Sequence, residues 1–205
     1  FHKTNEARST LRMAAVDPVT GAVDRNFAPK PVSQVFALAA DQSGVYAALG
    51  GQGGRAVAFS PATGATRWTR VFDGDAQAVA VLDGTVYVGG HFDRACTTTN
   101  NGVRGLCTDG SVPRGKLAAV DAQGNLLPWA PQANGVAGTR QLAVSQPLGS
   151  ISAVGDFTMV SAVTRKRYAA FSGVTPRRES AAQQAAIDYV ASYNFDTTIA
   201  DGTFD

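Results

Sequence analysis

Residues that could take part in catalysis are few in this chain of 205 residues. Its only histidines are His2 and His91, so a mechanism that needs an imidazole base depends on one or both of them. His91 lies in the Gly-Gly-His-Phe motif of residues 89–92, and a later copy of this motif has Asp156 at the same place. A position that accepts either His or Asp is more typical of an exposed rim than of a catalytic centre.

A pair of carboxylates could hydrolyse glycosidic bonds, because that reaction needs two such groups about 5 to 10 Å apart. Motifs of serine hydrolases, zinc proteases, P-loop proteins and dinucleotide-binding proteins are absent from the sequence. The glycine-rich run 50–54 joins two expected strands, where no helix N-terminus could bind a phosphate. The sequence therefore favours a non-enzymatic protein but leaves catalysis open. The aspartates expected in loops or at strand ends, none of which stands out, are Asp24, Asp73, Asp75, Asp93, Asp109 and Asp156.

Both cysteines, Cys96 and Cys107, lie in one polar, glycine-broken segment between residues 92 and 114. A disulfide across so short a loop would hold the loop in shape and would indicate an oxidising compartment. We expect this disulfide. Free thiols and a metal site are the alternatives, although a metal would need more soft ligands than this segment offers.

The same segment supplies the candidate ligand contacts. Ordered polar loops on a rigid scaffold often carry binding residues, and the charged residues Arg94, Arg104 and Asp109 lie in this one. The alternative interpretation is a solvent-exposed decoration without a ligand.

Two alternating motifs repeat along the chain and determine how these loops are positioned. Each is typical of a β-hairpin, since Pro fixes φ in the turn and Gly accepts the positive φ that closes it. Allowing for an insertion at 92–114, the period is about 40 to 45 residues, the size of a four-stranded propeller blade. The first motif occurs at 13–21, 57–64, 117–124 and, in part, 168–172; the second occurs at 45–51, 86–92 and 151–157.

The repeat predicts an all-β fold, a partial β-propeller of four-stranded antiparallel blades with about three blades present. Closed propellers need at least four blades, so we expect another chain or fragment to supply the missing ones. The chain starts inside a repeat, which favours the same expectation. The expected strands are 12–16, 22–26, 34–40, 44–49, 55–60, 65–71, 77–82, 85–90, 115–121, 125–129, 139–145, 149–155 and 166–172.

The only tryptophans, Trp68 and Trp129, follow the turn glycines Gly64 and Gly124 by four and five residues. An aromatic residue at a fixed place in each repeat favours packing between neighbouring blades. A platform that stacks sugars is the alternative.

At these residues the sequence resembles a known family. Residues 58–68, Ala-Phe-Ser-Pro-Ala-Thr-Gly-Ala-Thr-Arg-Trp, resemble the tryptophan-docking repeat of quinoprotein-type (PQQ-like) β-propellers. Together with the Val-Tyr-Val-Gly-Gly-His-Phe motif of 86–92, they more closely resemble secreted propeller-repeat proteins of high-GC Gram-positive bacteria. The resemblance implies a fold and a secreted location but little about function, because propellers include enzymes, receptors and scaffolds. A quinone-dependent oxidoreductase is a minor alternative, since no cofactor site can be placed.

The sequence pattern changes after the last repeat. We expect incomplete propeller blades over 1–173, a linker over 174–186 and the first strand and turn of a second domain over 187–205. The last segment alternates with a period of two and resembles the start of a laminin-G-like (concanavalin-like) jelly roll. That resemblance makes calcium the one cofactor candidate; otherwise we expect no cofactor and no metal.

The net charge argues against a nucleic-acid partner, and the hydropathy argues against a membrane span. The 18 Lys and Arg against 16 Asp and Glu give a net charge of +2, too small and dispersed for nucleic-acid binding. No apolar run approaches the roughly 20 residues that span a bilayer, and the N-terminal residues have no signal-peptide pattern.

We therefore expect a secreted or cell-surface-associated, non-catalytic β-propeller module for recognition or scaffolding. It would act at the cell envelope or on an extracellular polymer, with an extracellular polysaccharide or protein as its partner. The alternative is an accessory fragment of a larger extracellular carbohydrate-active enzyme whose catalytic residues lie outside this chain.

Overall fold

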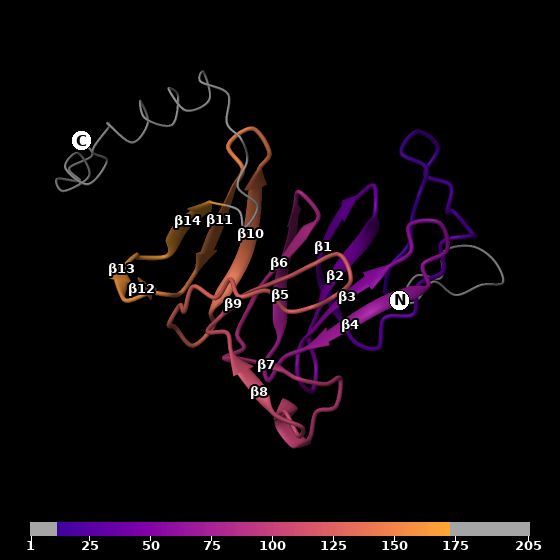
Figure 1. Ribbon diagram of the computed structural model, residues 1–205. Helices are drawn as coiled ribbons and strands as arrows, with labels where there is room; N and C mark the ends of the chain where they lie inside the picture. Colours follow the sequence, from indigo (N-terminus) through magenta and orange to yellow (C-terminus); the bar gives the residue numbers. More distant parts are fainter. Residues whose placement is uncertain (1–11, 173–205) are drawn as a thin grey trace, which may run out of the picture.

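A computed structural model describes residues 12–172 of the chain (Figure 1). Within this range the fold is all-β, as predicted, and consists of antiparallel sheets. The expected linker at 174–186, the expected jelly-roll strand at 187–205 and His2 lie outside the described residues.

Three sheets follow one another along the chain, and the strands of each are joined mainly by tight turns. The first sheet has the order β1 (Val35–Asp41), β2 (Gly44–Leu49), β3 (Arg55–Phe59), β4 (Thr66–Val71). The second has the order β5 (Ala76–Leu82), β6 (Thr85–Gly90), β9 (Leu117–Val120). The third has the order β10 (Thr139–Ser145), β11 (Ser150–Gly155), β14 (Tyr168–Ser172).

The outermost expected strands are shorter than predicted. Residues 12–16 and 22–26 form only the bridge between Val16 and Val23, and 125–129 forms only the bridge between Leu126 and Val120. These segments alternate less regularly between apolar and polar residues, and each forms its bridge with only one neighbouring segment.

Two small hairpins were not predicted. One joins β7 (Arg94–Cys96) to β8 (Ser111–Pro113), and the other joins β12 (Met159–Val160) to β13 (Val163–Thr164). Both lie in loops that differ between repeats, so the repeat pattern carried no signal for them.

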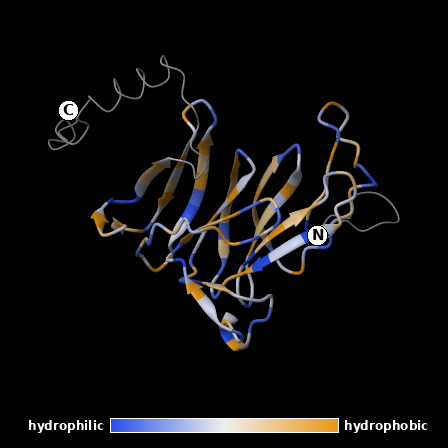
Figure 2. Cartoon of the chain, viewed as in Figure 1, coloured by the Kyte–Doolittle hydropathy of each residue, from blue (hydrophilic) through white to orange (hydrophobic). Residues whose placement is uncertain are grey.

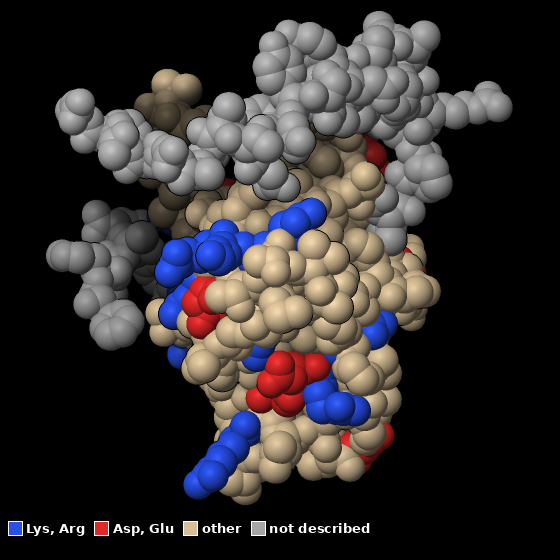
Figure 3. Space-filling model, turned by 90° about the vertical axis from the view of Figure 1, so that its left-hand side faces the viewer, with Lys and Arg blue, Asp and Glu red and all other residues tan. Residues whose placement is uncertain are grey.

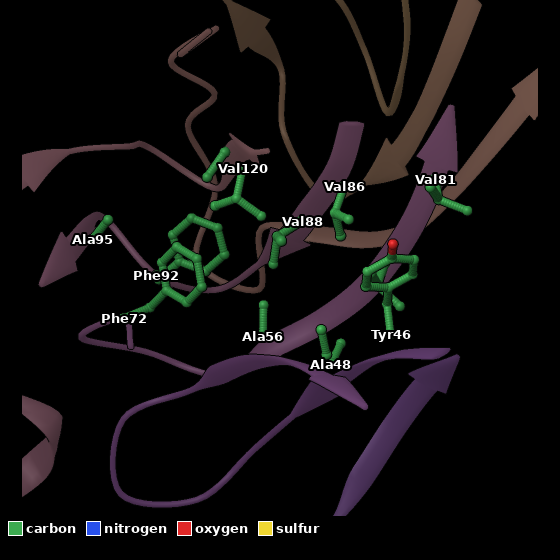
Figure 4. Close-up of a cluster of buried hydrophobic side chains, with 14 residues drawn as sticks. Tyr46, Ala48, Ala56, Phe72, Val81, Val86, Val88, Phe92, Ala95 and Val120 are labelled. Atoms are coloured by element: carbon green, nitrogen blue, oxygen red, sulfur yellow. The ribbon is translucent and has the colours of Figure 1, made fainter. Parts of the chain in front are cut away.

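The core is divided among the spaces between consecutive sheets. Between the first and second sheets, Tyr46, Ala48 and Ala56 face Val86 and Val88 (Figure 4). Between the second and third sheets a separate cluster contains Tyr87, Leu117 and Ile151, among others. A smaller cluster joins the first sheet to residues 13–27. The second sheet thus buries one face against the first sheet and the other against the third.

Both tryptophans pack in these spaces, as the recurrence predicted. Trp68 lies 6.1 Å from Tyr46 between ring centroids, and its indole N–H donates to the carbonyl of Ala122 at 3.0 Å. Trp129 contacts Tyr87 and Phe171 edge to face, with centroids 5.0 and 5.4 Å apart. Each indole therefore contacts residues from both sides of its space.

The first strands of the three sheets lie next to one another, with β5 between β1 and β10. Each carries a β-bulge at the same place, where the pairing register shifts between Val35 and Ala37, Ala76 and Ala78, or Thr139 and Gln141. A bulge re-aims the side chain of the extra residue. The extra residues here are Phe36, Gln77 and Arg140.

The recurring glycines at the ends of β6 and β11 let the first two strands of a sheet approach closely. A Cβ on Gly90 would fall on the carbonyl oxygen of Asp75, and one on Gly155 would fall on that of Gly138. Gly90 does not have a positive φ. Glycine is therefore required at position 90 because there is no space for a side chain, and not because of the backbone conformation.

We predict that Gly90→Ala destabilises the fold, because a backbone carbonyl cannot move aside as a side chain can. Overpacking of this kind costs about 2–3 kcal/mol of unfolding free energy, which thermal or urea denaturation would measure. Gly84→Asn is the control: Gly84 has φ +75° and no atom within 4 Å of its added Cβ, and Asn tolerates that backbone. Equal stability of the two variants would contradict the steric role of Gly90.

Candidate functional site

The insertion between β6 and β9 folds as a disulfide-closed hairpin. Cys96 and Cys107 are bonded, with Cα atoms 5.1 Å apart, which confirms the predicted disulfide. β7 and β8 form its two strands, and the short 3-10 turn η1 (Val103–Gly105) lies at its end. In Figure 1 this hairpin extends below the sheets. We name residues 94–113 the insertion hairpin.

The base of the insertion hairpin is fixed to the sheets. The rings of Phe72 and Phe92 stack with centroids 4.2 Å apart, and Phe72 forms a β-bridge with Ala95. The Asp73 carboxylate accepts the backbone N–H groups of Asp93 and Arg94, both at 2.9 Å. The hairpin is therefore held by packing and by charge-assisted hydrogen bonds.

The glycine-rich run 50–54 contacts the far end of the hairpin. The Gln52 amide donates to the carbonyl of Gly102 at 2.8 Å, and the Asn101 amide donates to the carbonyl of Gln52. A Cβ on Gly105 would lie 2.6 Å from the backbone nitrogen of Gly53. The two segments of the chain therefore touch backbone to backbone. The run, predicted as a tight link between strands, also supports the hairpin.

Two of the three predicted contact residues brace the hairpin itself. Arg94 donates through Nε to the Ser111 hydroxyl at 2.5 Å. The Asp109 carboxylate accepts from the Thr98 hydroxyl at 2.7 Å and from the Asn100 amide at 2.8 Å. These two hydrogen bonds, the one from Thr98 above all, lower the pKa of Asp109. Arg94 and Asp109 thus shape the loop.

Arg104 is the predicted contact residue that keeps its charged group unpaired. It is exposed, it has a positive φ of 58°, and its guanidinium makes no hydrogen bond or ion pair with any described residue. Val103 and Leu106 on either side are 75% and 65% exposed. Figure 2 shows hydrophobic and hydrophilic colours side by side at this end of the hairpin.

Sequence reasoning missed Val103 and Leu106. Their signal was the presence of two branched apolar residues in an otherwise polar, cysteine-closed loop. We name residues 103–106 the hairpin tip. It presents a cation between two apolar side chains on a rigid support, a combination suited to contact with another molecule.

The aspartates considered for acid–base chemistry hold turns and loops in place. Asp75 accepts the N–H of Gly51 at 2.9 Å, and Asp93 pairs with Lys116 at 2.8 Å. Asp24 accepts the N–H of Asn26 at 2.8 Å. His91 is exposed at the end of β6. No group of three or more His, Cys, Asp or Glu within residues 12–172 could hold a metal ion, and the calcium candidate fell on residues outside that range.

A groove runs along the first strands of the three sheets. It contains two cavities of about 830 and 290 Å³, and Val79 and Leu142 line both of them. The larger cavity lies at the turns that follow these strands and is lined by Asp41, Ser43 and Asp83, among others. The smaller lies at the bulged end and is lined by the three bulge residues Phe36, Gln77 and Arg140. These volumes lie within or near the 300–1,000 Å³ of small-molecule sites.

Sequence analysis did not identify the groove residues. Their signal was that equivalent repeat positions hold three unlike residues, whereas the core positions are alike. This signal could be recognised only once the bulges were known, because the bulges remove Phe36, Gln77 and Arg140 from the regular alternation of the strands.

Basic side chains gather on the side of the molecule where β13 and β14 lie (Figure 3). The described basic run in this region, residues 165–167, is exposed. It gives the third repeat a cationic surface in a chain of low net charge.

Comparison with known proteins gives no family: no family model matches this chain, and no curated protein matches it. Among the helices of the described range, none is long and apolar enough to cross a membrane.

We predict a pH dependence of stability that arises from Asp156. The backbone N–H of Ala137, at 2.7 Å, holds the pKa of this carboxyl below its ordinary value, and that of Gly138 at 2.6 Å adds to the effect. A depressed pKa contributes stability above the unfolded value of about 3.9, which is lost as the pH falls through the folded value. Asp156→Asn should therefore lower the melting temperature more at pH 7 than near pH 2. An equal effect at both pH values would contradict this.

Proposed function

We propose that this chain forms part of a secreted, non-catalytic β-propeller module for recognition or scaffolding at the cell envelope or on an extracellular polymer. In this proposal it is a relative of the secreted propeller-repeat proteins of high-GC Gram-positive bacteria that its motifs resemble. The disulfide in the insertion hairpin supports an oxidising, extracellular location.

Three features support the propeller. Successive antiparallel sheets pack face to face. Their first strands lie side by side and carry the same bulge. Aromatic residues at equivalent places pack between the sheets. Repeat units of this kind bury their faces against their neighbours.

Apolar residues exposed on the first and third sheets support a partner that supplies further blades. Leu38 on the first sheet is 54% exposed, whereas Val79 and Leu142, at the equivalent place after each bulge, are 6% and 8% exposed. On the third sheet, Val154 is 39% and Tyr168 is 56% exposed. Exposed apolar faces and sheet edges invite association.

The observation that carries the recognition function is the hairpin tip. Arg94 and Asp109 of the insertion hairpin are engaged in hydrogen bonds within it, while Val103, Arg104 and Leu106 face solvent. Because the disulfide and the contacts with 50–54 order the tip in advance, binding would cost little conformational entropy.

We predict that the chain binds extracellular polysaccharides or envelope preparations on an array without releasing soluble products. Arg104→Ala should weaken binding about tenfold or more, as for arginine hot spots. A double Cys96→Ser, Cys107→Ser variant should also bind more weakly because the tip loses its order.

The control for these variants is Lys30→Ala, which removes an exposed positive charge elsewhere and should leave binding unchanged. Release of soluble products that a single Asp→Asn change abolishes would instead favour the carbohydrate-active enzyme. Equal binding by the Arg104 variant would contradict the role of the tip.

We predict that the purified chain does not behave as a 21.2 kDa monomer, because its first and third sheets expose apolar side chains. Light scattering after size-exclusion chromatography would measure the mass. Leu38→Glu should reduce association, whereas Val19→Glu, at a turn residue that is 90% exposed, should not. A well-behaved monomer would contradict the proposal that further blades complete the fold.

A further inference from the structure

The bulged end of the groove gathers three side chains whose chemistry is complementary to one kind of ligand. Phe36, Gln77 and Arg140 occupy equivalent places in three repeats and line the same cavity of about 290 Å³. The bulges thus bring an aromatic ring, an amide and a guanidinium to one cavity.

Arg140 supplies an unpaired cation. It is exposed and makes no hydrogen bond or ion pair with any described residue. No acidic residue lines this cavity. A planar guanidinium without a partner matches a carboxylate, which it can bind through two parallel hydrogen bonds.

Gln77 supplies a side-chain amide in the cavity lining. Its oxygen is enclosed by the protein, since it has almost no accessible surface and no hydrogen-bond partner. The amide N–H groups are therefore the part of Gln77 that can donate to a ligand hydroxyl.

Phe36 supplies an apolar surface. Its ring is 45% exposed, and it lies against Gly50, where an added Cβ would overlap the ring. The glycine therefore leaves room for the ring to lie at the cavity. An exposed ring in a fixed position can stack against the C–H face of a sugar.

We propose that this end of the groove binds a uronic acid unit of an acidic polysaccharide. A single uronate ring offers a carboxylate for Arg140, a hydroxyl for Gln77 and a C–H face for Phe36. The bulges argue against an extended peptide, because they interrupt the regular strand edge along which a peptide would pair.

The rest of the groove determines which sugar units can neighbour the bound uronate. The larger cavity of about 830 Å³ has room for them, and its lining includes the carboxyl residues Asp41 and Asp83 and no Lys or Arg. Like charges there disfavour a second uronate. The site therefore selects a uronate that is linked to neutral sugars over a polymer made of uronates alone.

Isothermal titration with glucuronosyl-xylotriose, which carries one carboxylate, tests this site. Neutral xylotetraose, tetragalacturonate and the peptide tetra-alanine serve as comparison ligands. We expect wild-type protein to bind glucuronosyl-xylotriose more tightly than all three, and more weakly as salt is added.

Variants of Arg140 and Phe36 separate the contribution of the cation from that of the aromatic ring. Arg140→Ala should weaken binding of glucuronosyl-xylotriose about tenfold or more and leave binding of xylotetraose unchanged, since it removes a charge-assisted pair. Phe36→Ala should weaken binding of both sugars. Lys30→Ala is the matched loss of an exposed cation and should change neither.

Several results would overturn the proposal: equal affinity of the two xylose-based ligands, no effect of Arg140→Ala, or tighter binding of tetra-alanine. No heat of binding with 10 millimolar ligand, about the weakest affinity worth assigning to a site, would overturn it as well. Arg104→Ala tests the hairpin tip separately, so the outcome at the groove is independent of the outcome at the tip.

Discussion

The structure depends on the packing of each sheet against the next sheet along the chain. A sheet of this composition has two apolar faces, and both must leave water. Between the first two sheets, small residues such as Ala48 and Ala56 lie opposite the branched Val86 and Val88. Gly54 brings the backbones of neighbouring repeats into contact, because a Cβ there would fall on backbone atoms of Gly74 and Ala76. The repeat therefore determines both the composition of the faces and the spacing between the sheets.

This packing leaves the strand ends and loops free to differ between repeats. The loop after the second strand is the short run 50–54 in the first sheet, the insertion hairpin in the second, and the β12–β13 hairpin in the third. The bulge residue likewise changes from Phe36 to Gln77 to Arg140. Variation on a constant scaffold is where binding residues are commonly found.

Most arginines in the packed region stabilise loops. Arg70 donates to the carbonyl of Gly124 at 2.6 Å, and Arg114 donates to that of Leu127 at 2.8 Å. Arg104 and Arg140 have no such partners. One lies at a tip held by a covalent bond, and the other lies at a groove formed where three sheets meet. The two candidate surfaces are thus built independently, and both present a cation beside apolar groups.

The sequence by itself determined the all-β class, the positions of most strands in the three sheets and the disulfide. Each depends on neighbours in sequence: alternation and turn residues for the strands, and a short loop for Cys96 and Cys107. It also identified the insertion hairpin as a candidate surface, but not which of its residues are free. Arg94 and Asp109 proved to be engaged because their partners Ser111 and Thr98 come within reach only when the hairpin closes.

Only the tertiary structure decided the groove. Residues 36, 77 and 140 are far apart in sequence, and regular alternation would have placed them on sheet faces. The bulges turn them out of the sheets, and the packing of β1, β5 and β10 brings them together. Local sequence patterns specify strands and turns because those depend on adjacent residues, whereas a site formed across sheets depends on which faces pack together.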